Sequence, residues 1–229
     1  MVKLNSFWQK LLLGESLLEK VDSPINGEIK VVENIFGRRE MVVGGVCQSG
    51  ELVERVWQVG IRAIRNTQNV IRNVLILGLG CGDAARLVAE KWPGCKIVGV
   101  EIDPKVVEIG KKYFGLGEIK NLEIAIDDAL MVGSGSEKWG VRREVRSGKW
   151  DLVLVDLYLG KKYPKGAESE EFINGLKKIL AKNGVVIFNR LAYGDLKKEA
   201  IQFSEKLRKY FPKVWTKKAV TNLLIFCQN

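Results

Sequence analysis

The sequence of 229 residues contains no histidine, and this absence removes several kinds of active site at once. Without imidazole there is no Ser-His-Asp or Cys-His catalysis and no His-ligated zinc. The four cysteines show no CxxC pairing, so the sequence indicates neither a zinc site nor a disulfide framework, and we expect no metal. Proton transfer must therefore fall to Asp, Glu, Lys, Tyr or Cys side chains.

Long apolar runs are also lacking. No run approaches the roughly 20 residues that a helix needs to cross a bilayer. Residues 11–13 are too short a run for the core of a signal peptide, and Gly14 and Glu15 interrupt it. We therefore expect no membrane association and a cytoplasmic protein.

Acidic residues are in deficit, with 27 Asp and Glu against 37 Lys and Arg, which gives a formal charge of +10. A basic balance is typical of many proteins that bind nucleic acid. The basic residues of this chain are scattered, however, which favours a solvated basic surface. One basic loop, with Arg142, Arg143, Arg146 and Lys149, leaves a weak nucleic-acid hypothesis open.

The N-terminal part of the chain is expected to form a small appendage over residues 1–67. Apolar side chains at helical spacing predict an amphipathic helix over residues 1–20. Turn signals at residues 23–27 open a segment, 21–48, in which short β-rich runs are split by glycines, and this predicts hairpins. A linking helix is expected over residues 51–66.

Apolar runs and helical patterns alternate over residues 68–229. Val74–Leu77 is a continuous apolar run, as expected for a central parallel strand covered on both faces. Asp103 is expected to cap a helix that begins at Pro104. Further helices are expected over 83–92, 168–182 and 196–210, and further strands over 96–100, 122–126, 152–155, 185–188 and 223–226. Such βα units predict an α/β fold with a doubly wound, mostly parallel sheet, which binds ligands beyond the carboxyl ends of its strands.

A glycine-rich segment joins the first of these strands to the next helix. Gly78, Gly80 and Gly82 give the motif GxGxG, in which glycines let the backbone turn sharply and approach a ligand. A dinucleotide fingerprint would need a third glycine at position 83, where the chain has Asp83. The motif fits a nucleoside better than a pyrophosphate, although a tight turn without a ligand would also explain it.

Carboxylates follow the next three strands. Glu101, at the end of the second strand, can accept hydrogen bonds from both ribose hydroxyls. Asp127 and Asp128 follow the third strand, where a carboxylate can accept from an adenine amino group, and Asp156 ends the fourth. The alternative for each is a solvated strand end, a turn residue or a cap. Together with the glycine loop they indicate an adenosine-containing ligand that lacks phosphates.

These residues resemble a known family. Residues 74–156 resemble the Rossmann-like core of class I S-adenosylmethionine-dependent transferases, and residues 22–190 are similar to spermidine synthases, the polyamine aminopropyltransferases. The more particular likeness lies in the segments 23–33, 36–39 and 45–49 and in the VEIDP motif at 100–104. The resemblance implies S-adenosylmethionine or its decarboxylated form as donor, a small-molecule amine as acceptor, and a β appendage that could form a homodimer.

The resemblance also implies roles for single residues. Gln48 would contact the nucleoside, Ile102 would stack on the adenine, and Asp128 would accept from its amino group, while Glu101 would bind the ribose. Asp156 would orient and deprotonate the attacking amine. An ammonium cannot attack a sulfonium carbon until it loses a proton, and a positioned carboxylate can take it.

Three positions depart from the family's pattern. Leu159 stands where the family has a second Asp, Cys81 where it has an acid in the glycine loop, and Trp57 where it has a substrate-side Tyr. We expect Trp57, Tyr158 and Leu159 in the substrate pocket and Cys81 at the cofactor. The loss of two carboxylates weakens recognition of a cationic polyamine. Without the loop acid, the carboxylate of ordinary S-adenosylmethionine is no longer repelled.

Three hypotheses follow for the function. The first is a spermidine-synthase-like transferase that moves an aminopropyl-type group to an amine. The second is a methyltransferase on the same scaffold, with an unknown acceptor that could be RNA or DNA. The third is a catalytically silent nucleoside-binding homologue, which the residues at 57 and 159 favour.

Overall fold

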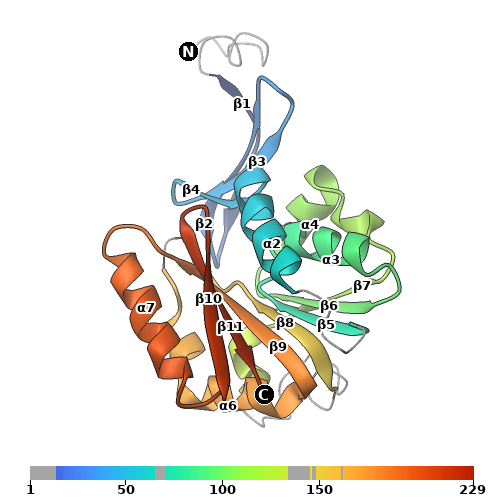
Figure 1. Ribbon diagram of the computed structural model, residues 1–229. Helices are drawn as coiled ribbons and strands as arrows, with labels where there is room; N and C mark the ends of the chain where they lie inside the picture. Colours follow the sequence, from blue (N-terminus) through green and yellow to red (C-terminus); the bar gives the residue numbers. More distant parts are fainter. Residues whose placement is uncertain (1–13, 65–70, 134–144, 146–147, 161) are drawn as a thin grey trace, which may run out of the picture.

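Two sheets make up much of the described chain, which comprises residues 14–64, 71–133, 145, 148–160 and 162–229 of this computed structural model. The N-terminal sheet is antiparallel, with the strand order β1-β2-β3-β4. The larger, seven-stranded sheet has the order β10-β11-β9-β8-β5-β6-β7. Figure 1 shows the N-terminal sheet standing above the larger one, with helix α2 (Glu51–Ala63) following it. The predicted linking helix is thus confirmed, and residues 65–70 lie outside the described part.

The N-terminal sheet confirms the predicted hairpins and corrects one helix. Its strands are β1 (Glu15–Ser23), β2 (Gly27–Asn34), β3 (Arg39–Val43) and β4 (Val46–Ser49). The helix predicted over residues 1–20 is wrong for residues 15–20, which belong to β1, while residues 1–13 lie outside the described part. The pairing of β1 with β2 shifts between Leu17 and Glu19. This bulge interrupts the alternation of apolar and polar residues by which a strand is predicted.

The larger sheet confirms the predicted α/β fold, mostly parallel and covered on both faces. Its strands are β5 (Asn73–Leu77), β6 (Lys96–Glu101), β7 (Leu122–Ile126), β8 (Trp150–Val155), β9 (Leu180–Leu191), β10 (Lys213–Ala219) and β11 (Asn222–Gln228). Strands β5 to β9 are parallel, whereas β11 runs antiparallel to both β9 and β10. All side chains of Val74–Leu77 are fully buried, as expected of a strand between two layers of helices.

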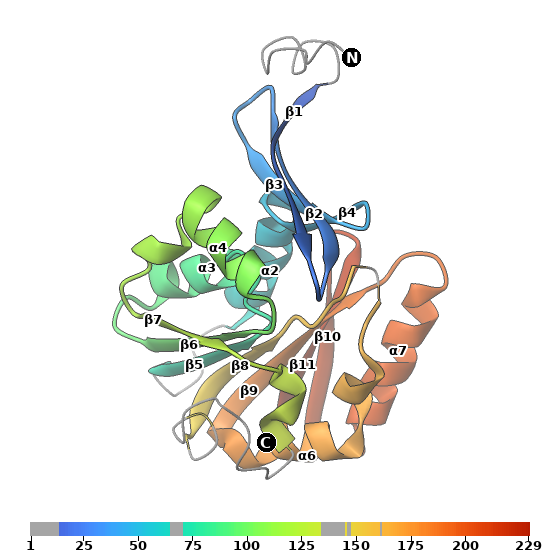
Figure 2. The same cartoon turned by 180° about the vertical axis from the view of Figure 1, so that it is seen from behind.

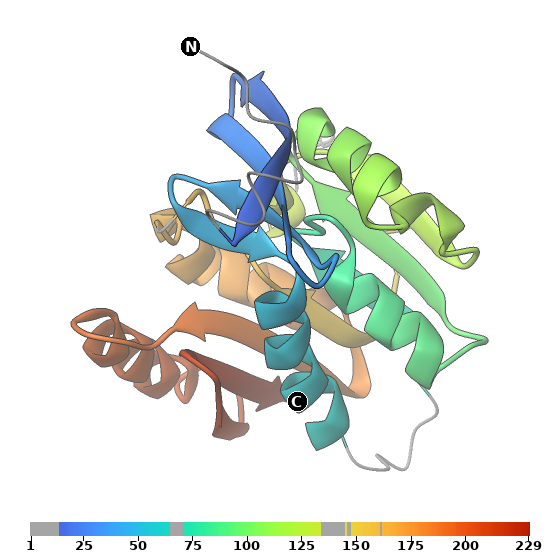
Figure 3. The same cartoon turned by 90° about the horizontal axis from the view of Figure 1, so that it is seen from above.

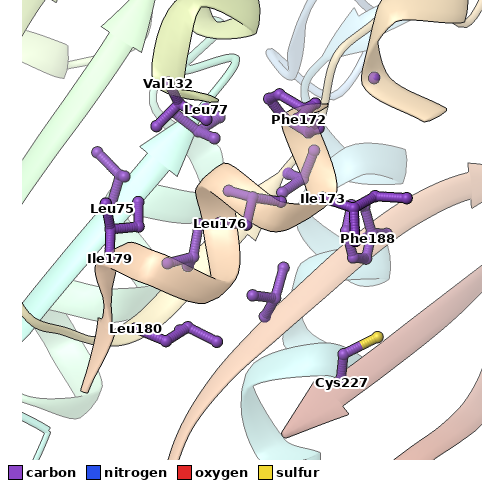
Figure 4. Packing of buried hydrophobic residues seen from close by; sticks show 14 of the residues in the cluster. Leu75, Leu77, Val132, Phe172, Ile173, Leu176, Ile179, Leu180, Phe188 and Cys227 are labelled. Carbon is purple, nitrogen blue, oxygen red and sulfur yellow. The ribbon is translucent and has the colours of Figure 1, made fainter. Parts of the chain in front are cut away.

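Helices cover the two faces of this sheet. Helix α2 lies with α3 (Asp83–Lys91) and α4 (Pro104–Tyr113) on one side, and α6 (Glu170–Ile179) lies with α7 (Leu196–Leu207) on the other, as Figure 3 shows from above. Short 3-10 turns occur at Leu116–Glu118, Ala129–Gly133 and Lys165–Glu168. In Figure 4, Phe172, Leu176 and Ile179 of α6 share one face of the helix and belong to the same buried cluster as Leu75 and Leu77 of β5.

Two predicted elements differ from the structure at the C-terminal side. The helix predicted over 168–182 ends at Ile179, because Leu180 already pairs with Trp150 as the first residue of β9. Strand β10 was not predicted at all. Its sequence KVWTKKA is rich in lysine, and it forms the exposed edge of the sheet, where charged side chains prevent pairing with other chains.

Asp103 holds the two sheets together. It caps α4 by accepting a hydrogen bond from the backbone N–H of Lys105 at 2.9 Å, which confirms its predicted role as a cap. The same carboxylate accepts from Ser23 Oγ at 2.5 Å and from Asn26 Nδ2 at 2.6 Å. Ser23 is the last residue of β1 and Asn26 lies in the turn before β2, and this end of the hairpin reaches down toward the larger sheet in Figure 2.

Candidate active site

A cavity of about 550 Å³ lies between the N-terminal sheet and the carboxyl ends of the parallel strands. Its roof comes from β3, β4 and the first turns of α2, and its floor from the loops that follow β5, β6, β7 and β8 and from the end of β9. Four carboxylates line it, namely Asp83, Glu101, Asp128 and Asp156. No Lys or Arg of the described chain does so. The volume suits a small-molecule ligand.

Backbone packing requires glycine at two of the three glycine positions in the loop. Gly78 has φ +85°, and a Cβ there would lie 2.1 Å from the carbonyl oxygen of Asp156. Gly82 has φ +97°, and its Cβ would lie 2.5 Å from Leu116 Cδ1. Both positions therefore require glycine whether or not a ligand is bound. Gly78 and Gly80 line the cavity, and Gly82 does not.

Glu101 lies beside the glycine loop and is only 8% exposed. Its Oε2 accepts from the N–H of Gly80 at 2.9 Å, and its Oε1 accepts from the N–H of Asp103 at 3.1 Å. Burial raises the pKa of Glu101, while these backbone hydrogen bonds lower it. Each carboxylate oxygen keeps another lone pair. Glu101 can therefore still accept two hydroxyl groups, as predicted for a ribose.

Ile102 and Asp128 line the cavity on the same side as Glu101. Ile102 is 39% exposed and offers an apolar surface, which the predicted stacking on an adenine requires. Asp128 Oδ1 accepts from the N–H of Leu130 at 2.9 Å. Asp127 does not line the cavity, and its Oδ1 accepts from the N–H of Asp128 at 2.7 Å, so it acts as a turn residue.

Asp156 lies at the carboxyl end of β8, the central strand of the larger sheet. Its Oδ2 accepts from Nε1 of Trp57 in α2 at 2.8 Å, and its Oδ1 accepts from Nδ2 of Asn189 in β9 at 2.9 Å. Burial raises the pKa of Asp156 to about 6, against the lowering effect of these two hydrogen bonds. A carboxylate with a pKa near neutral pH can serve as a general base.

The amide of Asn189, which donates to Asp156, is itself oriented by the amide of Asn222. Oδ1 of Asn189 accepts from Nδ2 of Asn222 at 2.7 Å, and Oδ1 of Asn222 accepts from the hydroxyl of Thr221 at 3.0 Å. The hydroxyl of Thr221 holds the carbonyl oxygen of Asn222, so each amide turns its NH₂ group toward the next acceptor. The amide relay, Thr221–Asn222–Asn189, therefore presents only donors to Asp156.

Sequence analysis missed both asparagines of the relay. Asn189 directly follows the apolar run Val185–Phe188, the same signal by which Asp156 was identified, so it could have been found. Asn222 gave no such signal, because it begins the last strand. It reaches the cavity because β11 runs antiparallel to β9, which brings its start to the carboxyl edge of the sheet.

Cys81 was expected at the cofactor, but the structure places it away from the cavity. Cys81 is fully buried and does not line the cavity, and its Sγ lies 3.4 Å from Met41 Sδ in the cluster between the N-terminal sheet and α4. The carboxylate that reaches the cavity from this segment is that of Asp83. It accepts from the N–H of Gly50 at 3.0 Å and from Arg86 Nη2 at 2.9 Å. Burial raises the pKa of Asp83 and that of Cys81.

Gln48, Trp57, Tyr158 and Leu159 all line the cavity. Nε2 of Gln48 donates to the carbonyl of Gly160 at 2.8 Å, which joins the roof to the loop after β8. Oη of Tyr158 accepts from the N–H of Leu191 at 2.6 Å. Leu159 is 45% exposed.

The basic loop falls largely outside the described part of the chain, which omits Arg142, Arg143 and Arg146. Lys149 is described, and its Nζ donates to the carbonyl of Lys178 at 2.8 Å. No group of three Cys, Asp or Glu that could hold a metal occurs in the described chain. None of its helices is long and apolar enough to span a bilayer.

A Rossmann-like sheet with this cavity at its strand ends defines a class of protein, the doubly wound α/β proteins that bind a ligand beyond the carboxyl ends of their strands. Within that class, the model of the spermine/spermidine synthase domain matches residues 61–226, and the chain belongs to this family. The spermidine synthase of Thermotoga maritima shares the fold, with a TM-score of 0.71 and 19% identity over 93% of this chain and 72% of that one. Human methyltransferase-like protein 13, solved in complex with SAH, has a TM-score of 0.60 and 24% identity over 78% and 82% of the two chains.

Curated relatives include both aminopropyltransferases and methyltransferases. The polyamine aminopropyltransferase of Vibrio vulnificus is 29% identical over 54% of this chain and 39% of its own length. The eEF1A lysine and N-terminal methyltransferase homologue of Drosophila pseudoobscura is 28% identical over 75% of this chain and 26% of its own length. The chain therefore spans about a quarter to two fifths of these relatives.

Proposed function

We propose that this protein transfers an aminopropyl-type group from a sulfonium nucleoside to an amine, with Asp156 as the base. The position of Asp156 carries this proposal. It lies in the cavity with both oxygens held by neutral N–H donors, and no Lys or Arg of the described chain lines the cavity beside it. A buried carboxylate without a cationic neighbour favours a positively charged ligand.

The donor is proposed to lie on the side of Glu101, Ile102 and Asp128, which suit a ribose and an adenine. When bound, it supplies a carbon made electrophilic by the adjacent sulfonium. The charge of the cavity bears on which donor fits. Cys81 alone would admit the carboxylate of ordinary S-adenosylmethionine, but Asp83, two residues further on, lines the cavity with three other carboxylates, and these oppose it. The decarboxylated donor brings only positive groups, which is why we propose it first.

Asp156 is proposed to prepare the acceptor for attack. An amine is protonated at neutral pH and has no lone pair to offer, so Asp156 takes its proton. The nitrogen then forms a bond to the donor carbon while the carbon–sulfur bond breaks and its electron pair stays on sulfur. Trp57 and Asn189 keep the carboxylate in one orientation throughout.

Methyl transfer to an amine is a second candidate. Leu159, in place of a second acid, removes one reason to bind a polyamine. The chain is also similar to an eEF1A lysine and N-terminal methyltransferase homologue. The same nucleoside site and the same base would serve this reaction, with ordinary S-adenosylmethionine as donor.

Titration calorimetry with each donor, followed by mass spectrometry of amines incubated with protein and donor, tests the proposal. Preferential binding of the decarboxylated donor and an aminopropyl adduct would support it. Binding of S-adenosylmethionine and a methyl adduct would support the second candidate. If neither donor bound, or if donors bound and no amine was modified, the proposed enzymatic function would be wrong.

A further inference from the structure

The order of the strands divides the cavity into two halves on either side of Asp156. Strands β5, β6 and β7 lie on one side of β8, and the loops that follow them contribute the proposed nucleoside half. Strands β9, β11 and β10 lie on the other side, and α2 packs against β10 and, at Gly60, against Leu224 of β11. We call this other side the acceptor half. It is lined by Trp57, Tyr158, Leu159, Asn189, Leu191 and Asn222.

The acceptor half differs from the nucleoside half in its charge. Glu101 and Asp128 line the nucleoside half, whereas Asp156 is the one carboxylate that the described residues offer to the acceptor half. Asp83 also lines the cavity, but it begins α3 beside the glycine loop and pairs with Arg86. An acceptor therefore meets one carboxylate in the acceptor half, on which Asp83 acts electrostatically from the side of the glycine loop, and beyond Asp156 it meets aromatic, aliphatic and amide side chains.

We infer, on the basis of the proposed function, that the acceptor carries a single ammonium on an apolar stem. A diamine would place its second ammonium among Tyr158, Leu159 and Leu191, where the acceptor half has no carboxylate to replace lost water. An apolar stem would instead bury its surface against Trp57, Leu159 and Leu191.

The step conserves atoms and charge. The ammonium gives its proton to Asp156, its nitrogen bonds to the donor carbon, and the carbon–sulfur bond breaks, leaving a neutral thioether. A free alkylamine and a lysine side chain share this chemistry, since each has one ammonium on a chain of methylene groups. The test therefore includes both.

Relative kcat/KM values for three acceptors test the inference, with the donor that the protein binds. The acceptors are n-butylamine, 1,4-diaminobutane and N-acetyl-lysine amide. We expect either monoamine to be preferred over the diamine by roughly tenfold or more, because the second ammonium loses water without gaining a partner. Whichever of n-butylamine and N-acetyl-lysine amide has the higher kcat/KM shows whether the acceptor is a free alkylamine or a lysine side chain.

Leu159→Asp supplies the missing carboxylate and sharpens the test. We expect kcat/KM for 1,4-diaminobutane to rise roughly fivefold, which corresponds to one partly exposed ion pair, with no gain for n-butylamine. Leu17→Asp is the matched control, because Leu17 is 47% exposed in β1, does not line the cavity and gives the same charge change. Both leucines are exposed enough for the fold to tolerate the change.

A wild-type preference for 1,4-diaminobutane would overturn the inference and leave the proposed function standing. So would an equal effect of the two Leu→Asp variants on the diamine. Failure to alkylate any of the three amines, with donor binding intact, would overturn the proposed function and this inference with it.

Discussion

The indole N–H of Trp57 donates a 2.8 Å hydrogen bond to Oδ2 of Asp156, so a residue of α2 orients the carboxylate at the end of β8. An indole can only donate, whereas a tyrosine hydroxyl in its place could also accept. Trp57 therefore cannot take a proton from a ligand, and of the two side chains only Asp156 is able to accept one.

Replacing Trp57 by Phe should change the pH dependence of the reaction. The lost N–H normally lowers the pKa of Asp156, so that pKa should rise and the acidic limb of kcat should move to higher pH. Trp150→Phe is the control, because Trp150 is also buried and its Nε1 donates to the carbonyl of Val145 at 3.1 Å. If both variants kept the wild-type pH profile, Trp57 would serve packing alone.

The rate should follow the ionisation of Asp156 itself. Since burial raises its pKa to about 6, kcat should rise with pH up to about 6 and then level off. Asp156→Asn should lower kcat roughly 10²- to 10⁴-fold. Asp151→Asn, at the other end of β8, should not, because Asp151 accepts from the N–H groups of residues 72 and 73 and does not line the cavity. A rate that is flat between pH 5 and 7 would contradict a role for Asp156 as base.

The same pKa has a consequence for stability. The carboxyl of Asp156 has an ordinary pKa of 3.8, so between pH 4 and 6 the folded protein holds a proton that the unfolded chain has lost. The contribution of Asp156 to the free energy of unfolding is therefore full below about pH 4 and falls as pH rises through 6. Urea unfolding of the wild type and of Asp156→Asn across this range checks the sign, since the variant should lack that fall.

The amide relay should control the orientation of Asn189. In Asn222→Asp the donor to Asn189 becomes an acceptor, so the amide of Asn189 should reverse and turn its oxygen toward Asp156. We expect kcat to fall and its acidic limb to move to higher pH. Asn121→Asp is the control, because Nδ2 of Asn121 donates to the carbonyl of Cys95 at 2.7 Å far from the cavity. Equal kinetics of the two variants would argue against the relay.

Ribose recognition by Glu101 can be tested by changing protein and ligand together. Glu101→Gln should weaken donor binding by roughly tenfold, because a charged acceptor is lost. For a donor without the two ribose hydroxyls, the substitution should change Kd much less. Calorimetry of the four combinations of protein and donor gives the coupling free energy between the Glu101 carboxylate and the ribose hydroxyls. Equal losses for both ligands would mean that Glu101 does not contact the ribose.

Asp103→Ala should destabilise the protein by more than the loss of a helix cap. It removes the cap of α4 and also the partner of Ser23 and Asn26, for which we expect roughly 2–4 kcal/mol. Ser169→Ala removes only the cap of α6 and should cost about 1 kcal/mol. Urea unfolding of both variants gives the difference. Equal losses would mean that the bonds to the β1–β2 turn add nothing.

The sequence predicted most of the larger sheet because local signals decide it. The apolar run Val74–Leu77 needs cover on both faces, and carboxylates at the strand ends marked Glu101, Asp128 and Asp156. Strand β10 escaped prediction because edge strands follow no apolar pattern and depend on a partner distant in sequence.

Side-chain direction within a loop was also beyond the sequence. Cys81 and Asp83 are two residues apart in the glycine segment, yet one packs into the core and the other lines the cavity. The left-handed φ angles of Gly80 and Gly82 determine which way each neighbour points. Such angles follow from the packed backbone, as the contact of Gly78 with Asp156 illustrates.

The roof of the cavity comes from the N-terminal sheet and α2 and its floor from the strand ends of the larger sheet, so any molecule that fills the cavity contacts both sheets. The energy of its binding adds to the cohesion of β4 with the glycine loop, where the N–H of Cys81 already donates to Ser49 Oγ at 3.0 Å. We therefore expect that a ligand bound in the cavity slows proteolysis of the N-terminal sheet, because its binding energy adds to the contacts between the two sheets.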